Sequence, residues 1–217
     1  SSDHSVEAID LEYDTKSCIV DKHNCKIIAS QFNKIIYNQD AKKFLADKNW
    51  DNVLIERCYE GTVLLVYHHN NSWNVSTRRC LDAKDSSWIK NKSYREMFEE
   101  SIDGKFEFDD LDKNMCYYFV LIHYKNKNII NYSNIGYGNL YKNVVHVMTT
   151  KKYTLEEVDY KINNEVKTPE RILVSNLNEL EDMLQTISTT DETKKLISTE
   201  GFILRYYNGD VKKSSFT

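Results

Sequence analysis

Proline is almost missing from this sequence, with Pro169 as its one example in 217 residues. Asparagine, lysine and isoleucine are frequent instead. This bias is common in proteins from A/T-rich genomes, including those of many large DNA viruses. It therefore fits an A/T-rich genome, for example a viral one, and says little about function.

Cysteine is present but lacks the spacing of a structural site. The five cysteines stand at positions 18, 25, 58, 80 and 116, an odd number with no Cys-x-x-Cys motif. Neither a disulfide framework nor a zinc site is predicted. We therefore expect a reducing compartment, and specifically a cytoplasmic protein.

Long apolar runs and an excess of positive charge are both absent. No stretch approaches the ~20 apolar residues of a membrane-spanning helix, and no apolar signal run opens the chain, so neither membrane insertion nor secretion is expected. The formal net charge is −4. Proteins that coat nucleic acid are usually basic, so coating of DNA is not expected and any RNA contact must use a local patch.

What remains is the composition of an ordinary folded domain, with 41% hydrophobic and 29% charged residues. Apolar runs bounded by polar turns predict strands at 17–20, 25–30, 62–67, 73–77, 117–124, 144–148 and 202–207. We expect 129–132 to pair with 117–124, while 155–161 fits either a strand or a short helix.

Two segments predict helices. One covers residues 93–101. The other follows Asn176, which resembles a helix N-cap because Glu179 stands three residues later and leucines recur at helical spacing beyond it. Antiparallel strands with a few helices predict an α+β fold, in one domain over residues 1–217.

Four segments, in chain order, carry a family resemblance. They are residues 27–38, which include Lys34; Cys58-Tyr59-Glu60-Gly61-Thr62 with the later Ser76-Thr77-Arg78-Arg79; residues 117–123; and Glu200-Gly201 with Lys212-Lys213. Together they resemble the RNA ligase family of nucleotidyltransferases, which is related to mRNA capping enzymes. The resemblance covers about residues 17–215.

The resemblance implies two antiparallel β-sheets that flank a nucleotide cleft, with peripheral helices, as in nucleotidyltransferase and ATP-grasp-like folds. It also implies a set of residues that bind nucleotide or RNA. These are Lys34, Tyr59, Glu60, Gly61, Arg78, Phe119, Glu200, Lys212 and Lys213.

The catalytic residues of the family are not retained. Its members attack the α-phosphorus of a nucleotide with an unprotonated lysine, and Mg²⁺ neutralises the leaving pyrophosphate. Here Cys58 stands at the nucleophile position, and Val120 stands where a glutamate grips the ribose. We therefore predict an inactive domain that needs no cofactor and binds a nucleotide or an RNA 5′ end, a capped mRNA end being one specific version.

Two alternatives stay open. An active ATP-dependent RNA ligase or related nucleotidyltransferase would need Mg²⁺ and ATP or GTP, and a lysine from elsewhere. A scaffold would bind a protein partner and leave the cleft empty. The sequence also leaves open which aromatic side chains line the cleft, because strand parity within 117–124 decides the face that each one takes. His123, on this apolar strand, is expected to be a core histidine with its hydrogen bonds satisfied.

Overall fold

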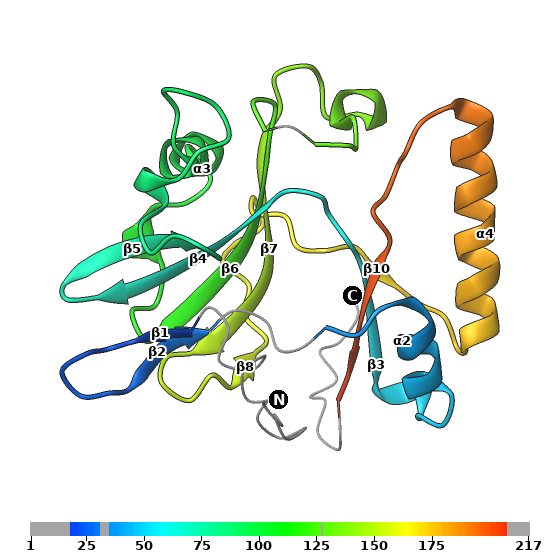
Figure 1. Ribbon diagram of the computed structural model, residues 1–217, viewed down its shortest axis with the longest axis horizontal. Coiled ribbons are helices and arrows are strands. Elements are labelled where there is room, and N and C mark those ends of the chain that lie inside the picture. Colours follow the sequence, from blue (N-terminus) through cyan, green and yellow to red (C-terminus); the bar gives the residue numbers. More distant parts are fainter. Residues whose placement is uncertain (1–17, 31–34, 127, 208–217) are drawn as a thin grey trace, which may run out of the picture.

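The computed structural model describes residues 18–30, 35–126 and 128–207 (Figure 1). The α+β prediction is confirmed, since the described residues form three α-helices and three antiparallel sheets. The sequence led us to expect two sheets. The difference is that the strands predicted at 17–20 and 25–30 pair as a hairpin, β1 (Cys18–Val20) with β2 (Ile27–Ser30), which is a two-stranded sheet of its own.

The largest sheet has five strands in the order β5-β4-β6-β7-β8. Their bounds are β4 (Thr62–His69), β5 (Ser72–Thr77), β6 (Met115–His123), β7 (Lys142–Lys151) and β8 (Glu157–Val158). The pairing predicted for 129–132 is wrong, because β6 pairs with β7 and Tyr132–Ile135 forms a 3-10 helix. The ambiguous segment 155–161 contributes the short strand β8.

Helix α3 (Tyr94–Ile102) covers one face of this sheet. Ser93 and Glu96 begin the helix with a reciprocal capping box, which satisfies two backbone N–H groups that the first turn leaves without partners. The buried Phe98 of α3 meets Phe119 of β6 edge to face, with ring centroids 5.2 Å apart. The largest hydrophobic cluster among the described residues lies between α3 and the sheet.

The β1–β2 hairpin packs on the opposite face. Ile28 and Ala29 are buried against Leu65 and Tyr118, and the Tyr118 hydroxyl donates to the carbonyl of Ser30. The five-stranded sheet is therefore covered on both faces in its middle, by a helix on one side and a hairpin on the other. This explains why β6 is buried along almost its whole length.

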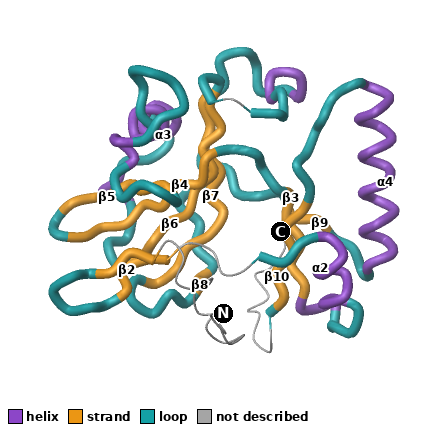
Figure 2. Tube along the Cα trace, viewed as in Figure 1, coloured by secondary structure: helices purple, strands orange, loops and turns teal. Residues whose placement is uncertain are grey.

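A separate three-stranded sheet has the order β10-β3-β9, from β10 (Phe202–Tyr206), β3 (Val53–Arg57) and β9 (Arg171–Ile172). Helices α2 (Asn38–Leu45) and α4 (Leu177–Lys194) lie beside it, away from α3 (Figure 2). Phe44 of α2 contacts Tyr206 of β10, and Lys42 Nζ lies 2.6 Å from a carboxylate oxygen of Glu181 in α4.

The predicted start of α4 is confirmed. The Asn176 side chain accepts a hydrogen bond from the Glu179 N–H at 2.9 Å, while the Glu179 carboxylate accepts from the N–H of Ser175. Helix α2 was not predicted, because its first residue follows Tyr37, which supplies no side-chain cap. Three further 3-10 helices lie at Trp50–Asn52, Ala83–Asp85 and Phe108–Asp110.

Membrane insertion finds no support in the helices. Within the described ranges, none combines the length and the apolar character needed to cross a bilayer. The longest, α4, carries charged residues along its length and keeps Leu184 partly exposed.

Gly61 lets β4 approach β6 at the point where the two sheets diverge. A Cβ at this position would lie 2.5 Å from the carbonyl oxygen of Leu121 and 2.7 Å from a methyl carbon of Val120. Such distances are below ordinary van der Waals contact, and one of the two atoms belongs to the backbone of the central strand. Gly61 therefore has a packing reason that is independent of any ligand.

We predict that Gly61→Ala lowers the free energy of unfolding by about 2 kcal/mol or more, because β4 and β6 must separate to admit the methyl group. Gly104→Ala is the matched control: its φ is +72°, but nothing lies within 4 Å of its Cβ position. That control should lose only about 1–2 kcal/mol from the left-handed backbone. Urea denaturation measures both, and equal losses would contradict the role given to close packing at Gly61.

Candidate functional site

The register of the three-stranded sheet brings two of the predicted site residues together. Phe202 of β10 lies opposite Arg57 of β3, and the next residue, Cys58, donates its backbone N–H to the carbonyl of Gly201 at 2.9 Å. The side chains of Cys58 and Glu200 are brought together as well. Cys58 Sγ lies 3.8 Å from a carboxylate oxygen of Glu200, so the position of the family's nucleophile faces a residue that was predicted to bind nucleotide.

The Cys58 thiol is in the wrong protonation state for a nucleophile. Burial, and then the charge and hydrogen bond of Glu200, raise its pKa to about 11. At neutral pH roughly one thiol in ten thousand is then ionised. Reactive cysteines show the opposite shift, because nearby positive charge stabilises their thiolates. Cys58 is therefore a half-buried hydrogen-bond donor to Glu200.

Glu60 holds a loop in place. Its two carboxylate oxygens accept the backbone N–H groups of Ile129 and Ile130 at 2.8 and 2.6 Å, and its own carbonyl accepts the hydroxyl of Tyr132 at 2.7 Å. These bonds explain why residues 129–132 do not join the sheet. Glu60 accepts hydrogen bonds from backbone N–H groups that would otherwise pair with a neighbouring strand. The contact of Glu60 with nucleotide stays a prediction. A bound nucleotide would have to share the Glu60 carboxylate with the backbone of residues 129 and 130.

Phe119, which was predicted to bind nucleotide, lies on the face of β6 away from Tyr59. It is fully buried on the α3 side of β6, stacked on Phe106 with ring centroids 5.8 Å apart. Successive residues of a strand point to opposite faces, so Val120 takes the side that faces Tyr59. Phe119 has no exposed surface to offer a base, and its predicted role in nucleotide binding is withdrawn.

The side chains beside Cys58 form a cluster of aromatic rings with a cationic edge. Tyr59 packs against the apolar cluster that contains Val120 and Tyr132. Burial, and then the neighbouring Tyr59, raise the pKa of Tyr137. Lys167 Nζ lies 4.5 Å from the centre of the Tyr137 ring. No local pattern marks Tyr137 or Lys167 in the sequence, because the loop that carries Tyr137 is positioned by Glu60.

Arg205 of β10 links the two larger sheets. It donates to the carbonyl of Val147 in β7 at 2.9 Å and to the carboxylate of Glu157 in β8 at 2.6 Å. The same guanidinium lies 3.1 Å from a carboxylate oxygen of Glu56 in β3, as an ion pair without hydrogen-bond alignment. The side chains of Arg205 and Glu56 are only 17% and 7% exposed. Burial raises the pKa of Glu56 despite the opposing effect of Arg205 and Arg171.

Arg78, another of the predicted residues, does not lie at Cys58. Arg78 lines a cavity of about 150 Å³ beside the β1–β2 hairpin, and Tyr59, Glu60 and Glu200 are not among the residues that line it. Lys34, Lys212 and Lys213 lie outside the described residues. Among the described residues, no cluster of three or more His, Cys, Asp or Glu side chains could hold a metal ion.

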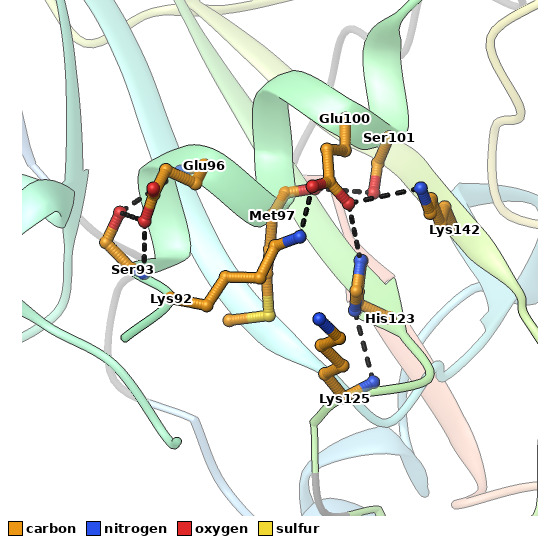
Figure 3. A network of polar contacts seen from close by, with 9 residues as sticks. All are labelled: Lys92, Ser93, Glu96, Met97, Glu100, Ser101, His123, Lys125 and Lys142. Carbon is orange, nitrogen blue, oxygen red and sulfur yellow. Dashed lines mark hydrogen bonds and ion pairs between the residues drawn. The ribbon is translucent and has the colours of Figure 1, made fainter. Parts of the chain in front are cut away.

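A second polar centre surrounds Glu100 of α3 (Figure 3). Its carboxylate accepts from Lys92, and Lys142 Nζ and His123 Nε2 lie 3.2 and 3.4 Å from it. The hydrogen bond from Lys92, more than any other contact, lowers the Glu100 pKa to about 2. The expectation for His123 is confirmed: it is fully buried, and its Nδ1 accepts the N–H of Lys125 at 3.1 Å. An open pocket of about 390 Å³ adjoins this centre and is lined by both acidic and basic side chains.

Sequence reasoning missed the centre around Glu100 because its members come from a loop, α3, β6 and β7. The one local signal was Ser93 with Glu96 three residues later, which marks the helix start that positions Glu100. Burial lowers the pKa of His123 despite the opposing effect of Glu100, and its Nδ1 accepts a hydrogen bond. The centre has the properties of a structural ion cluster.

We predict that Cys58 alkylates slowly at pH 8 and that its rate rises steeply only as the pH approaches 11, because the thiolate is the reactive species. Glu200→Gln should shift this rise to lower pH, since it removes the negative charge but leaves the burial. Mass spectrometry of iodoacetamide-treated protein measures the rate at each cysteine, with the exposed Cys25 as the accessible reference. Rapid labelling of Cys58 at pH 7 would contradict the protonated thiol.

We predict that Glu100→Gln destabilises the protein at pH 7 and that this loss fades as the pH falls. The carboxyl has its usual pKa of 4.5 in the unfolded chain and a pKa of about 2 in the folded one, so its contribution is present above pH 4.5 and disappears toward pH 2. Urea midpoints at pH 7 and pH 3 measure this. Glu99→Gln, which removes a neighbouring carboxylate paired with Arg95, is the control. A pH-independent loss for Glu100→Gln would contradict the assignment.

Comparison with protein-family models and with curated protein sequences gave no match. The resemblance to RNA ligases therefore rests on the four sequence segments. What the structure adds is local: Cys58 and Glu200 face each other, Val120 lies on the Tyr59 side of β6, and Phe119 does not.

Proposed function

We propose that this chain is a catalytically inactive, RNA-ligase-like domain that binds a nucleotide or the 5′ end of an RNA without forming a covalent adduct. The observation that carries the proposal is the pair of Cys58 and Glu200. The side chain at the position of the family's nucleophile lies 3.8 Å from Glu200, a residue implied to bind nucleotide, yet that position holds a thiol whose pKa is raised to about 11.

Noncovalent binding is supported by the surroundings of this pair. Tyr59 and Tyr137 supply aromatic faces, and stacking of a base on such a face contributes ~1–3 kcal/mol without a metal ion. Lys167 supplies positive charge, which suits phosphate. A methylated cap guanine would gain further, because its positive charge is attracted to the faces of aromatic rings.

The enzyme alternative requires a different nucleophile. A phosphoramidate forms on an amine, and the thiol of Cys58 neither supplies one nor ionises at neutral pH. The scaffold alternative requires that neither nucleotide nor RNA binds beside Tyr59. Both alternatives are outcomes of the following experiment.

The test is incubation with Mg²⁺ and labelled ATP or GTP, followed by denaturation, together with titration of short RNAs that carry a 5′ triphosphate or a methylated cap. We predict no label that survives denaturation, and saturable binding to one kind of 5′ end. Tyr59→Leu should weaken that binding about tenfold, as expected for the loss of one stacked base. Tyr153→Leu, at an exposed tyrosine in the turn after β7, should leave it unchanged.

A covalent adduct would overturn the proposal and establish the enzyme reading, with the labelled residue as the nucleophile. Absence of any saturable binding would favour the scaffold. Binding that is equally weakened by Tyr59→Leu and Tyr153→Leu would place the ligand elsewhere on the molecule.

A further inference from the structure

A tryptophan side chain is exposed in the segment between β5 and α3, residues 78–92. Trp88 is 58% exposed, and Leu81 of the same segment is 66% exposed. Tryptophan is highly buried on average in folded proteins, and it is enriched among the residues that dominate binding interfaces. The 3-10 helix Ala83–Asp85, also in this segment, contacts both α3 and β5. The segment therefore lies at the β5 edge of the five-stranded sheet, beside α3 and away from α4 (Figure 1).

The backbone on both sides of Trp88 is fixed by pairing. The Ser86 carbonyl accepts the N–H of Tyr94, the first residue of α3, at 2.9 Å. Ile89 and Lys92 pair as an isolated antiparallel β-bridge. The backbone that carries the indole is thus ordered without a ligand, which reduces the entropy that is lost on binding.

The segment is a basic part of an acidic chain. Its five arginines and lysines and its two aspartates give residues 78–92 a net charge of +3, whereas the whole chain has −4, which leaves −7 for the other residues. Arg79, Lys84 and Lys90 are exposed, and none of their side chains forms an ion pair or a hydrogen bond with another described residue. These three cations are therefore available to a ligand.

The carboxylates next to this segment are already engaged. Glu99 and Glu100 of α3 each accept a hydrogen bond from a nearby arginine or lysine side chain. Within the segment, the Asp82 carboxylate accepts the backbone N–H of Lys84 at 2.9 Å. These carboxylates have partners of their own and do not pair with the three exposed cations.

An exposed indole among cations fits single-stranded nucleic acid. Every base has a face that stacks on an aromatic ring, and phosphates pair with arginine and lysine. In a duplex the bases already stack on one another, so the indole would find no free base face. An acidic protein segment would meet the cations and use the indole only as an apolar surface. Since the net charge of −4 requires any RNA contact to use a local basic patch, this segment supplies one.

The start of the segment is within reach of the proposed 5′-end site. Leu64 is five residues after Tyr59, and Thr77, which directly precedes the segment, lies opposite Leu64 in the sheet. Five residues span at most about 18 Å and paired Cα atoms lie about 5 Å apart, so Thr77 is within about 23 Å of Tyr59. An RNA held beside Tyr59 by its 5′ end can therefore reach the segment with its following nucleotides.

We propose that residues 78–92 bind the body of a single-stranded RNA, with one base stacked on Trp88 and phosphates on Arg79, Lys84 and Lys90. The choice of RNA over DNA rests on the proposed function. The surface itself does not, because it contacts a base face and phosphates that any part of a strand supplies.

The probe is a 5′-hydroxyl dodecauridine with a fluorophore at its 3′ end, because its 5′ end carries neither phosphate nor cap. Fluorescence anisotropy measures its affinity. We expect saturable binding that Trp88→Ala weakens about tenfold, whereas Trp88→Phe retains a flat ring and loses less than about threefold. Tyr153→Leu, at an exposed tyrosine outside the segment, should leave the affinity unchanged. Thermal unfolding should be the same with and without Trp88→Ala, since this side chain is exposed.

The phosphate contacts are measured by the salt dependence of the same binding. For single strands, each phosphate contact contributes about 0.7 to the slope of log Kd against the logarithm of the salt concentration. Lys84→Gln combined with Lys90→Gln should therefore lower this slope by about 1.4. Lys194→Gln, which removes an exposed lysine of α4, is the matched control and should leave the slope unchanged.

Three results would overturn the RNA surface. They are no saturable binding of dodecauridine, binding that Trp88→Ala leaves unchanged, and displacement of the probe by a hexaglutamate peptide as readily as by unlabelled RNA, which would identify an acidic protein partner. Tighter binding of the matching oligothymidine would overturn the choice of RNA over DNA.

The two sites fail separately. Tyr59→Leu should weaken binding of a 5′ end but leave dodecauridine binding unchanged, and Trp88→Ala should do the reverse for dodecauridine and a mononucleotide. Dodecauridine binding without any 5′-end binding would retain the surface around Trp88 and reject the proposed function. The 5′-end binding without dodecauridine binding would reject the surface and retain the proposed function.

Discussion

One guanidinium group joins the two larger sheets of this protein. Arg205 donates to the backbone of β7 and to Glu157 of β8, while Glu56 of its own sheet lies against it. A charge of this kind is stable in a buried position only when its partners are in place, because the cost of removing it from water is several kcal/mol. Arg205 therefore fixes the relative position of the two sheets, and this in turn sets the position of the residues between them.

The positions of Cys58, Tyr59 and Glu200 depend on the same two sheets. Pairing of β3 with β10 places Cys58 beside Glu200, and close packing at Gly61 directs the chain from one sheet into the other. Glu60, between them, holds the loop that carries Tyr132 and Tyr137. Cys58, Tyr59, Glu60 and Gly61 are consecutive, and each has a structural role. Their pattern in the sequence therefore stabilises the fold whether or not a nucleotide is bound.

Local patterns in the sequence predicted most strands and the start of α4, because apolar periodicity and an Asn side chain at a helix start act over a few residues. The face that Phe119 takes could not be predicted, because β6 is apolar on both faces and its sequence pattern does not show which face α3 covers. The partners of Arg205 and of Glu60 are distant in sequence and come from short elements or loops. No periodicity marks them, so neither the link between the sheets nor the loop beside Tyr59 could be predicted.

The most direct test of this account is a double-mutant cycle between Arg205 and Glu157, which belong to different sheets. Urea denaturation of Arg205→Met, Glu157→Gln and the double variant gives the coupling free energy, with the exposed Arg57–Glu170 pair as the reference. The account predicts a coupling of about 1 kcal/mol or more for Arg205 and Glu157, and a smaller one for the exposed pair. A coupling near zero for Arg205 and Glu157 would show that the two sheets are held together by something else.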